Sequence, residues 1–169
     1  MYSLNVPVPT AVARLAGELA RELPGARARA RGEHSLLVKR LGPEEGGAID
    51  HLAERARTAI AGTEPFAVRV DGVDYFAEPE TGTGPVVYLT VESPPLVALH
   101  RRLCDAFDPV AHLEGEAYVP HVTIARGGEV AAAERLAERS IEPRSFEVTE
   151  LVVWDAERSL PTTRLSLPA

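Results

Sequence analysis

Cysteine and lysine are nearly absent from this 169-residue chain, which contains one of each, Cys104 and Lys39. A single thiol forms neither an intramolecular disulfide nor a cysteine-rich zinc site. No apolar run approaches the roughly 20 residues of a membrane span. The N-terminus lacks the basic segment and apolar stretch of a signal peptide. These absences predict a cytoplasmic protein that does not enter a membrane.

Positive charge is also in short supply, with 18 basic against 25 acidic residues and a net charge of −7. A protein that coats nucleic acid needs a broad positive surface, so the charge excludes that class. A nucleic-acid ligand would have to bind at a local basic site. The length and the 45% apolar content predict one domain spanning residues 1–169.

The spacing of apolar residues predicts a mixture of strands and helices. Asp71-Gly72 between two apolar runs predicts a hairpin. Strands that follow one another without a helix favour an α+β fold with antiparallel sheets. The predicted strands cover 4–9, 26–31, 34–41, 65–70, 73–76, 86–91, 118–125, 146–154 and 163–167, and the predicted helices 10–23, 44–61, 94–107 and 130–139.

The two halves of the chain look alike, because each contains a strand, a helix and then a strand with a histidine near its start. The segment from Val86 to His121 matches the segment from Leu4 to His34 in this respect. A His-x-Thr on one strand is common and usually carries no function. Two histidines at matching places in two similar halves are a stronger indication of a shared site.

The strand around His121 has the side chains of a phosphate site. Residues two apart share a face of a strand, so His121 and Thr123 point the same way. The imidazole transfers protons near neutral pH. The hydroxyl donates a hydrogen bond to a phosphoryl oxygen, and Arg126 adds a charged fork.

The segment Pro120 to Arg126 resembles the second His-x-Thr motif of the 2H phosphoesterase superfamily, in particular its 2'-5' RNA ligase and RNA 2',3'-cyclic phosphodiesterase branch. Leu41-Gly42, the segment 66–76 and the closing strands resemble the family in order and spacing. The resemblance implies two pseudo-symmetric lobes whose antiparallel sheets line a central cleft, with helices packed outside.

The first motif departs from the family pattern, because Leu36 stands where the family has serine or threonine. Ser35 is one residue too early, and the segment 34–42 is one residue longer than the usual form. A β-bulge re-aims neighbouring side chains, so a bulge would bring Ser35 into the cleft. Otherwise Lys39 or Arg40 would replace the missing hydroxyl.

The resemblance implies metal-free opening of a 2',3'-cyclic phosphate at an RNA end, or the reverse 2'-5' ligation. His121 would act as the base and His34 as the acid. Thr123 and Ser35 would steady the phosphorane, and the expected substrate contacts also include Arg126, Lys39 and Tyr118. We expect no cofactor, no metal and a monomer. A cyclic-nucleotide phosphodiesterase and a non-catalytic RNA- or nucleotide-binding protein remain alternatives.

Three arginines, at positions 27, 29 and 31, alternate along a predicted strand just before His34. They would guide an RNA backbone towards the cleft. A solvated edge strand explains the same pattern, because charges also protect sheet edges.

Overall fold

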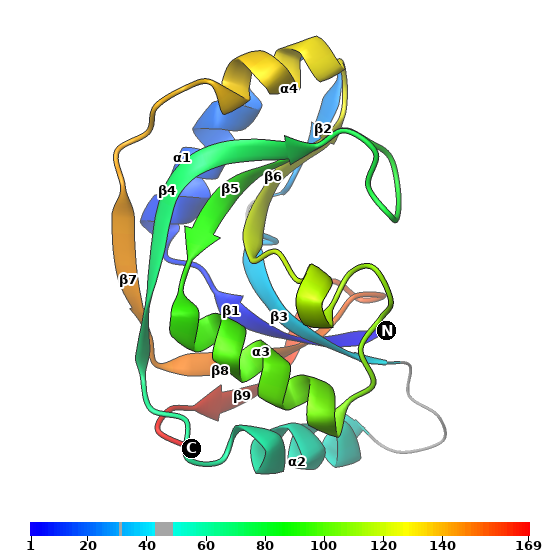
Figure 1. The fold of residues 1–169 in the computed structure, drawn as a ribbon, viewed down its shortest axis with the longest axis vertical. Helices are drawn as coiled ribbons and strands as arrows, with labels where there is room; N and C mark the ends of the chain where they lie inside the picture. Colours follow the sequence, from blue (N-terminus) through cyan, green and yellow to red (C-terminus); the bar gives the residue numbers. More distant parts are fainter. Residues whose placement is uncertain (31, 43–48) are drawn as a thin grey trace.

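The structure of the protein is a computed structural model that describes residues 1–30, 32–42 and 49–169. Strands and helices alternate irregularly along the chain, as Figure 1 shows. The elements are β1 (Tyr2–Pro7), α1 (Thr10–Ala20), β2 (Ala26–Ala28), β3 (Ser35–Gly42), α2 (Ile49–Ile60), β4 (Phe66–Phe76), β5 (Val86–Glu92), α3 (Pro94–Ala106), the 3-10 helix η1 (Gly115–Ala117), β6 (His121–Gly127), α4 (Val130–Ala137), β7 (Arg144–Val148), β8 (Glu150–Asp155) and β9 (Leu160–Ser166).

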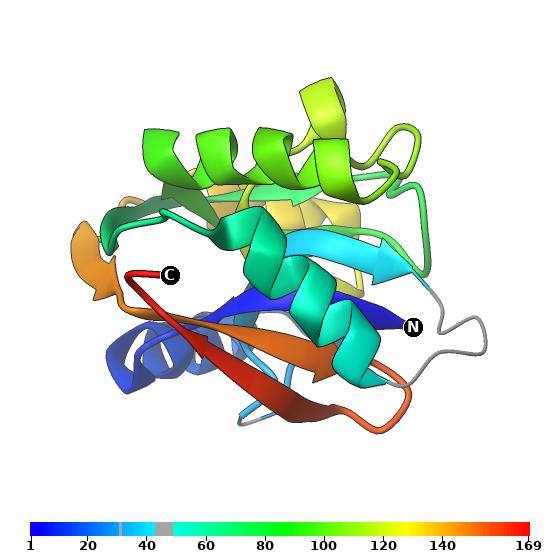
Figure 2. The ribbon, with the colours of Figure 1, turned by 90° about the horizontal axis from the view of Figure 1, so that it is seen from below.

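The strands form one curled sheet in the order β7-β4-β5-β6-β3-β1-β8-β9, with β2 paired to β6. All these pairs are antiparallel, so the α+β prediction is confirmed. The sheets of the two halves are continuous through β3 and β6, which pair at Leu36 and Val122. The helices lie outside the curl, where α1 packs on β6, α4 on β4, and α3 on β3 and α2 (Figures 1 and 2).

The core follows from the alternation of the strands. Leu4 and Val6 of β1, Leu36 of β3 and Ile124 of β6 are almost completely buried. Side chains two apart on a strand share a face, so these apolar positions pack beneath the sheet while their neighbours face the other side. The sequence pattern therefore sets which side chains of β3 and β6 leave the core.

Two strand predictions are wrong in detail. Asp71-Gly72 is not a hairpin turn but part of the continuous β4, where the pairing with β5 shifts register between Val70 and Gly72. Glycine inside a strand often marks such a bulge, and β4 keeps its partner β5 on both sides of it. The predicted strand 146–154 is two strands, β7 and β8, separated at Thr149.

The second predicted helix begins, within the described residues, at Ile49, and its predicted start at 44–48 lies outside them. Among the helices of the described ranges, none is long and apolar enough to cross a membrane.

Candidate active site

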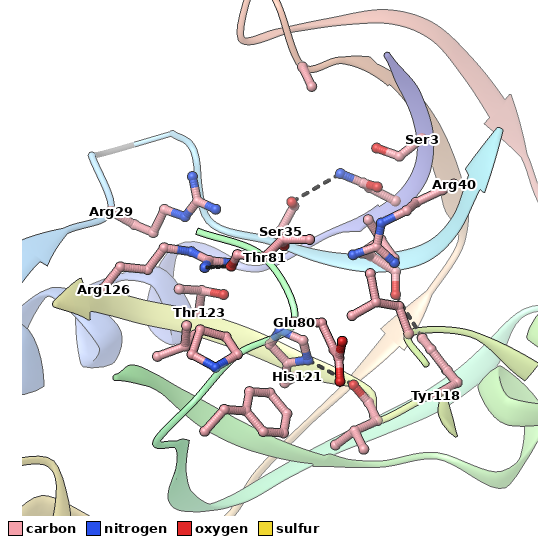
Figure 3. Close-up of a pocket in the computed structure, with 18 of the residues that line it drawn as sticks. Ser3, Arg29, Ser35, Arg40, Glu80, Thr81, Tyr118, His121, Thr123 and Arg126 are labelled. Atoms are coloured by element: carbon pink, nitrogen blue, oxygen red, sulfur yellow. Dashed lines mark hydrogen bonds between the residues drawn. The ribbon is translucent and has the colours of Figure 1, made fainter. Parts of the chain in front are cut away.

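A cavity of about 460 Å³ opens on the face of the sheet where β3 and β6 meet (Figure 3). Its walls include parts of β1, β3 and β6, Arg29 and Glu33 between β2 and β3, the loop between β4 and β5, the loop before β6, and the β8–β9 turn. The polar or charged residues of the lining include Asn5, Arg29, Glu33, Ser35, Arg40, Glu78, Glu80, Thr81, His112, Tyr118, His121, Thr123 and Arg126.

The strands β3 and β6 present equivalent positions to this cavity. They pair in antiparallel fashion at Leu36 and Val122, whose side chains face the core. Each strand then skips one residue in its pairing with the next strand, at Val38 in β3 and at Ile124 in β6. Because both the pairing and the bulge match, the residues on either side match as well.

Because of this match, each cavity residue of β3 has an equivalent cavity residue on β6. In each strand the second cavity residue comes two positions after the first, and the third comes five positions after it. All six side chains line the cavity, and they are Ser35, Leu37 and Arg40 on β3 and His121, Thr123 and Arg126 on β6.

His121 has one ring nitrogen fixed and one available. Nδ1 lies 2.7 Å from the carbonyl oxygen of Val119. A carbonyl only accepts, so Nδ1–H donates and the neutral ring carries its lone pair on Nε2. Burial, with the positive charges of Arg126, Arg40 and Arg29, lowers the pKa of His121 despite that bond. The imidazole is therefore neutral near pH 7, as a general base must be.

Arg126 is held at the other end of the same strand face. Its Nη1 donates to the carbonyl oxygen of Thr81 (3.0 Å) in the β4–β5 loop. The next residue, Gly82, has a positive φ of 78°, and a Cβ there would lie 3.1 Å from the Arg126 Nη1. The left-handed backbone of a glycine thus lets this loop close against the guanidinium.

Ser35 lines the cavity, and its Oγ accepts a hydrogen bond from Asn5 Nδ2 (3.1 Å). The bulge expected near it lies three residues later, at Val38. Ser35 reaches the cavity because the core-facing Leu36 fixes the alternation of β3. The same alternation directs the preceding residue away.

His34 is that residue, and the structure does not bring it opposite His121. It is 9% exposed, is not among the cavity-lining residues, and neither ring nitrogen has a hydrogen-bond partner among the described residues. Burial, and then the charge of Arg29, lower its pKa, with Glu33 opposing them. The arrangement of two facing imidazoles is therefore absent between these two histidines.

Lys39 also lies away from the cavity, contrary to its expected role as a phosphate contact. It is completely buried, and its Nζ donates to Glu114 Oε2 (2.6 Å) and to the carbonyl oxygens of Arg40 and Asp108. The bulge in β3 turns Lys39 inwards and Arg40 into the cavity.

Both carboxylate oxygens of Glu114 accept hydrogen bonds from neighbouring groups. Besides Lys39, it accepts from the backbone N–H of Arg40 (2.8 Å) and of Val110 (2.9 Å). Burial alone would raise the pKa of Glu114, but these donors outweigh it and hold the pKa below its usual range. The ion pair thus fastens the 108–114 loop to β3.

Tyr118 forms part of the cavity wall, as a substrate contact would. Its hydroxyl donates to the carbonyl oxygen of Leu37 (2.7 Å), and its ring stacks on the buried His100 at 3.8 Å. Burial raises the pKa of Tyr118. The hydroxyl proton is therefore engaged by a backbone carbonyl and is not available to a ligand.

The structure adds residues that the sequence pattern did not single out. Glu80 and His112 line the cavity from loops, where no periodicity marks them. Of the three alternating arginines, Arg29 lines the cavity and Arg27 does not, and Arg31 lies outside the described residues. Within the parts of the chain that the structure describes, no three His, Cys, Asp or Glu side chains are grouped to hold a metal.

The curled antiparallel sheet around this cavity agrees with the class of 2H phosphoesterases, to which the 2'-5' RNA ligase superfamily belongs. Within that class, the sequence profile of the 2'-5' RNA ligase superfamily matches residues 8–160, and the chain belongs to this family. A comparison with curated protein sequences gives no match.

Solved structures similar to this chain have the same fold. E. coli LigT complexed with 3'-AMP is 21% identical, with a TM-score of 0.64 over 99% of this chain and 98% of LigT. TT0787 of Thermus thermophilus is also 21% identical, with a TM-score of 0.62 over 98% and 94% of the two chains. E. coli LigT complexed with NADP+ is 20% identical, with a TM-score of 0.66 over 99% and 97%.

Proposed function

We propose that the protein is a metal-independent phosphoesterase that opens a 2',3'-cyclic phosphate at the end of an RNA or nucleotide, with His121 as its general base. The observation that carries this proposal is the His121 ring, whose Nδ1 is bound to Val119 and whose Nε2 is left to accept a proton. Membership of the 2'-5' RNA ligase superfamily supports the substrate class.

In the proposed reaction, Nε2 of His121 takes a proton from the attacking water. A P–O bond forms to that water oxygen, and the P–O bond to one ribose oxygen breaks. The leaving oxygen takes a proton from solvent, and the imidazolium later returns its own proton to solvent. Thr123 and Ser35 donate hydrogen bonds to the phosphoryl oxygens, and Arg126 offsets the charge that develops on them.

This mechanism uses one imidazole where two were expected. His34 is excluded from the proposal by its burial away from the cavity. A single base with solvent as the acid accelerates the reaction less than a matched pair of acid and base does. Each positioned proton transfer contributes about 10²–10⁴-fold to the rate.

The test is hydrolysis of a short RNA ending in a 2',3'-cyclic phosphate, with EDTA present. We expect His121→Gln to reduce kcat by about 10²-fold or more. His51→Gln is the matched control, because His51 is exposed on α2 and outside the cavity. Equal turnover by wild type and His121→Gln would refute the proposal.

A second candidate is a nucleotide-binding protein without turnover. It is favoured by Ser35 and Leu37, which stand on β3 where His121 and Thr123 stand on β6. LigT complexes with 3'-AMP and NADP+ support nucleotide binding in this fold. This candidate predicts that wild type binds adenosine 3'-phosphate but does not hydrolyse the cyclic RNA end.

A further inference from the structure

Arg29 and Arg126 are brought to the same end of the cavity by the pairing of β2 with β6. Ala28 pairs with Ala125, and the N–H of Arg29 donates to the carbonyl oxygen of Ile124 (3.0 Å). Both side chains line the cavity. Figure 3 shows them on one side of His121, with Arg40 on the other side.

The described residues give neither guanidinium of this pair a carboxylate partner. No acidic group of that part of the chain lies within ion-pair distance of Arg29 or Arg126, although Glu33 and Glu80 line the same cavity. The side-chain bond of Arg126 goes to the neutral carbonyl of Thr81. In contrast, Arg40 lies 3.5 Å from Glu114.

Two neighbouring positive charges in a partly enclosed site repel one another. The repulsion is felt at Arg126, because burial and then the charges of Arg29 and Arg40 lower its pKa. An anion between the two guanidiniums removes this cost. Arginine is well suited to such a ligand, since its planar fork binds phosphate through two parallel hydrogen bonds.

A cyclic phosphate is a diester with one negative charge, which balances only one of the two arginines. The charge that remains matches one further phosphate group. In an RNA chain the nearest such group is the phosphodiester on the 5' oxygen of the terminal ribose.

We propose that Arg29 forms a subsite for a second phosphate, beside the cyclic phosphate that Arg126 contacts, so that the cavity prefers a nucleotide with phosphates on both sides of the ribose. The natural substrate is then the end of an oligonucleotide rather than a mononucleoside cyclic phosphate. This inference rests on the proposed function and names the substrate class of the same site.

The test compares the affinities of adenosine 3'-phosphate and adenosine 3',5'-bisphosphate by titration calorimetry. For wild type we expect the bisphosphate to bind at least about tenfold more tightly, as one added charge-assisted hydrogen bond would give. Arg29→Ala should reduce this ratio to about one. Arg27→Ala is the matched control and should keep the wild-type ratio, because Arg27 lies two residues earlier, on β2, and outside the cavity.

Equal affinities for the two nucleotides in wild type, no binding of either one, or a ratio that survives in Arg29→Ala would each overturn the subsite. The measurement needs no turnover, so it stays informative if the chain does not hydrolyse a cyclic phosphate. A protein that prefers the bisphosphate but does not cleave the RNA end would retain the subsite and lose the proposed reaction. A loss of preference in Arg27→Ala as well would overturn the subsite too, because general charge would then attract the ligand.

Discussion

The two strands that meet at the cavity have the same backbone and different chemistry. Each strand places three side chains in the cavity, and the second and third come two and five residues after the first. Both strands contain a bulge between the second and the third of these residues. Only the last member is the same, an arginine in each half. The sets are Ser35, Leu37 and Arg40 on β3 and His121, Thr123 and Arg126 on β6.

This difference shows that the shape of the cleft and its chemistry have separate causes. The cleft depends on alternation and on the bulges, which Leu36 and Val122 anchor in the core. In the proposed reaction, proton transfer depends on one imidazole, and of these two strands β6 alone supplies an imidazole to the cavity. A half that keeps its backbone can therefore lose an imidazole and still form its side of the cavity.

A second difference lies at the position just before each arginine, where the side chain is buried in both strands. On β6 this residue is Ala125, whereas on β3 it is Lys39. A buried ammonium needs a partner, and Glu114 provides it from the 108–114 loop. The first half thus contributes a structural ion pair where the second contributes only packing.

The largest effect is expected from breaking that ion pair. Lys39→Met should lower the free energy of unfolding by about 3–5 kcal/mol, because it leaves the buried carboxylate of Glu114 without its cation. Urea denaturation measures the change.

The matched control for this variant is Arg57→Met, which breaks the exposed pair of Arg57 with Glu54 on α2. Exposed pairs contribute about 1 kcal/mol or less. If Lys39→Met cost no more than Arg57→Met, the ion pair would not hold the loop to β3.

Restoring the missing imidazole tests the comparison directly. Ser35→His places a ring at the position equivalent to His121, on the cavity side of β3. If the leaving oxygen then receives a positioned proton, kcat for the cyclic RNA end should rise by about 10²-fold.

Ser35→Asn controls for size and polarity, because the amide transfers no proton at this pH. A Ser35→His enzyme no faster than Ser35→Asn would show that the two positions are not equivalent in the reaction. The steady-state rate with EDTA present is the measurement for both variants.

Much of this fold follows from the sequence, because its elements have strong periodicity. The α+β class and the alternation around His121 and Thr123 depend only on which residues are apolar. The cavity residues of the first half were harder to predict, because His34 is the residue type that the resemblance to the family implies for catalysis. Its place is decided by Leu36, which must face the core and so fixes the alternation that turns His34 away from the cavity.

A signal for the correct alignment was present at the ends of the two strands. Arg40 and Arg126 each stand five residues after the first cavity residue, so matching the arginines equates Ser35 with His121. The burial of Lys39 had no such signal, because Glu114 lies 75 residues away in the chain. Loop residues such as Glu80 likewise reach the cavity through tertiary structure alone.

The pH dependence of turnover sharpens the assignment of the base. Burial and the three cavity arginines lower the pKa of His121 from its ordinary 6.5. Because the base must be unprotonated, kcat/KM should be level above pH 6.5 and fall about tenfold per unit only at more acid pH. A rate profile on the cyclic RNA end measures this, and an inflection above pH 6.5 would point to a different base.

The smallest effect on turnover is expected at His34, the residue that sequence alone sets beside His121. His34→Leu should leave kcat unchanged, because the ring lies outside the cavity.

The same variant should change how the stability of the protein responds to acid. Burial and Arg29 lower the pKa of His34 from 6.5, so below pH 6.5 the unfolded chain takes up a proton that the folded chain refuses. Wild type therefore loses stability as the pH falls through 6.5, and the leucine variant should lose less, with His100 and His121 still contributing to the remaining loss. Urea denaturation at pH 7.5 and pH 5.5, together with the turnover assay, separates the two roles. A His34→Leu protein that folds but does not turn over would return this imidazole to the reaction and make the two halves chemically alike.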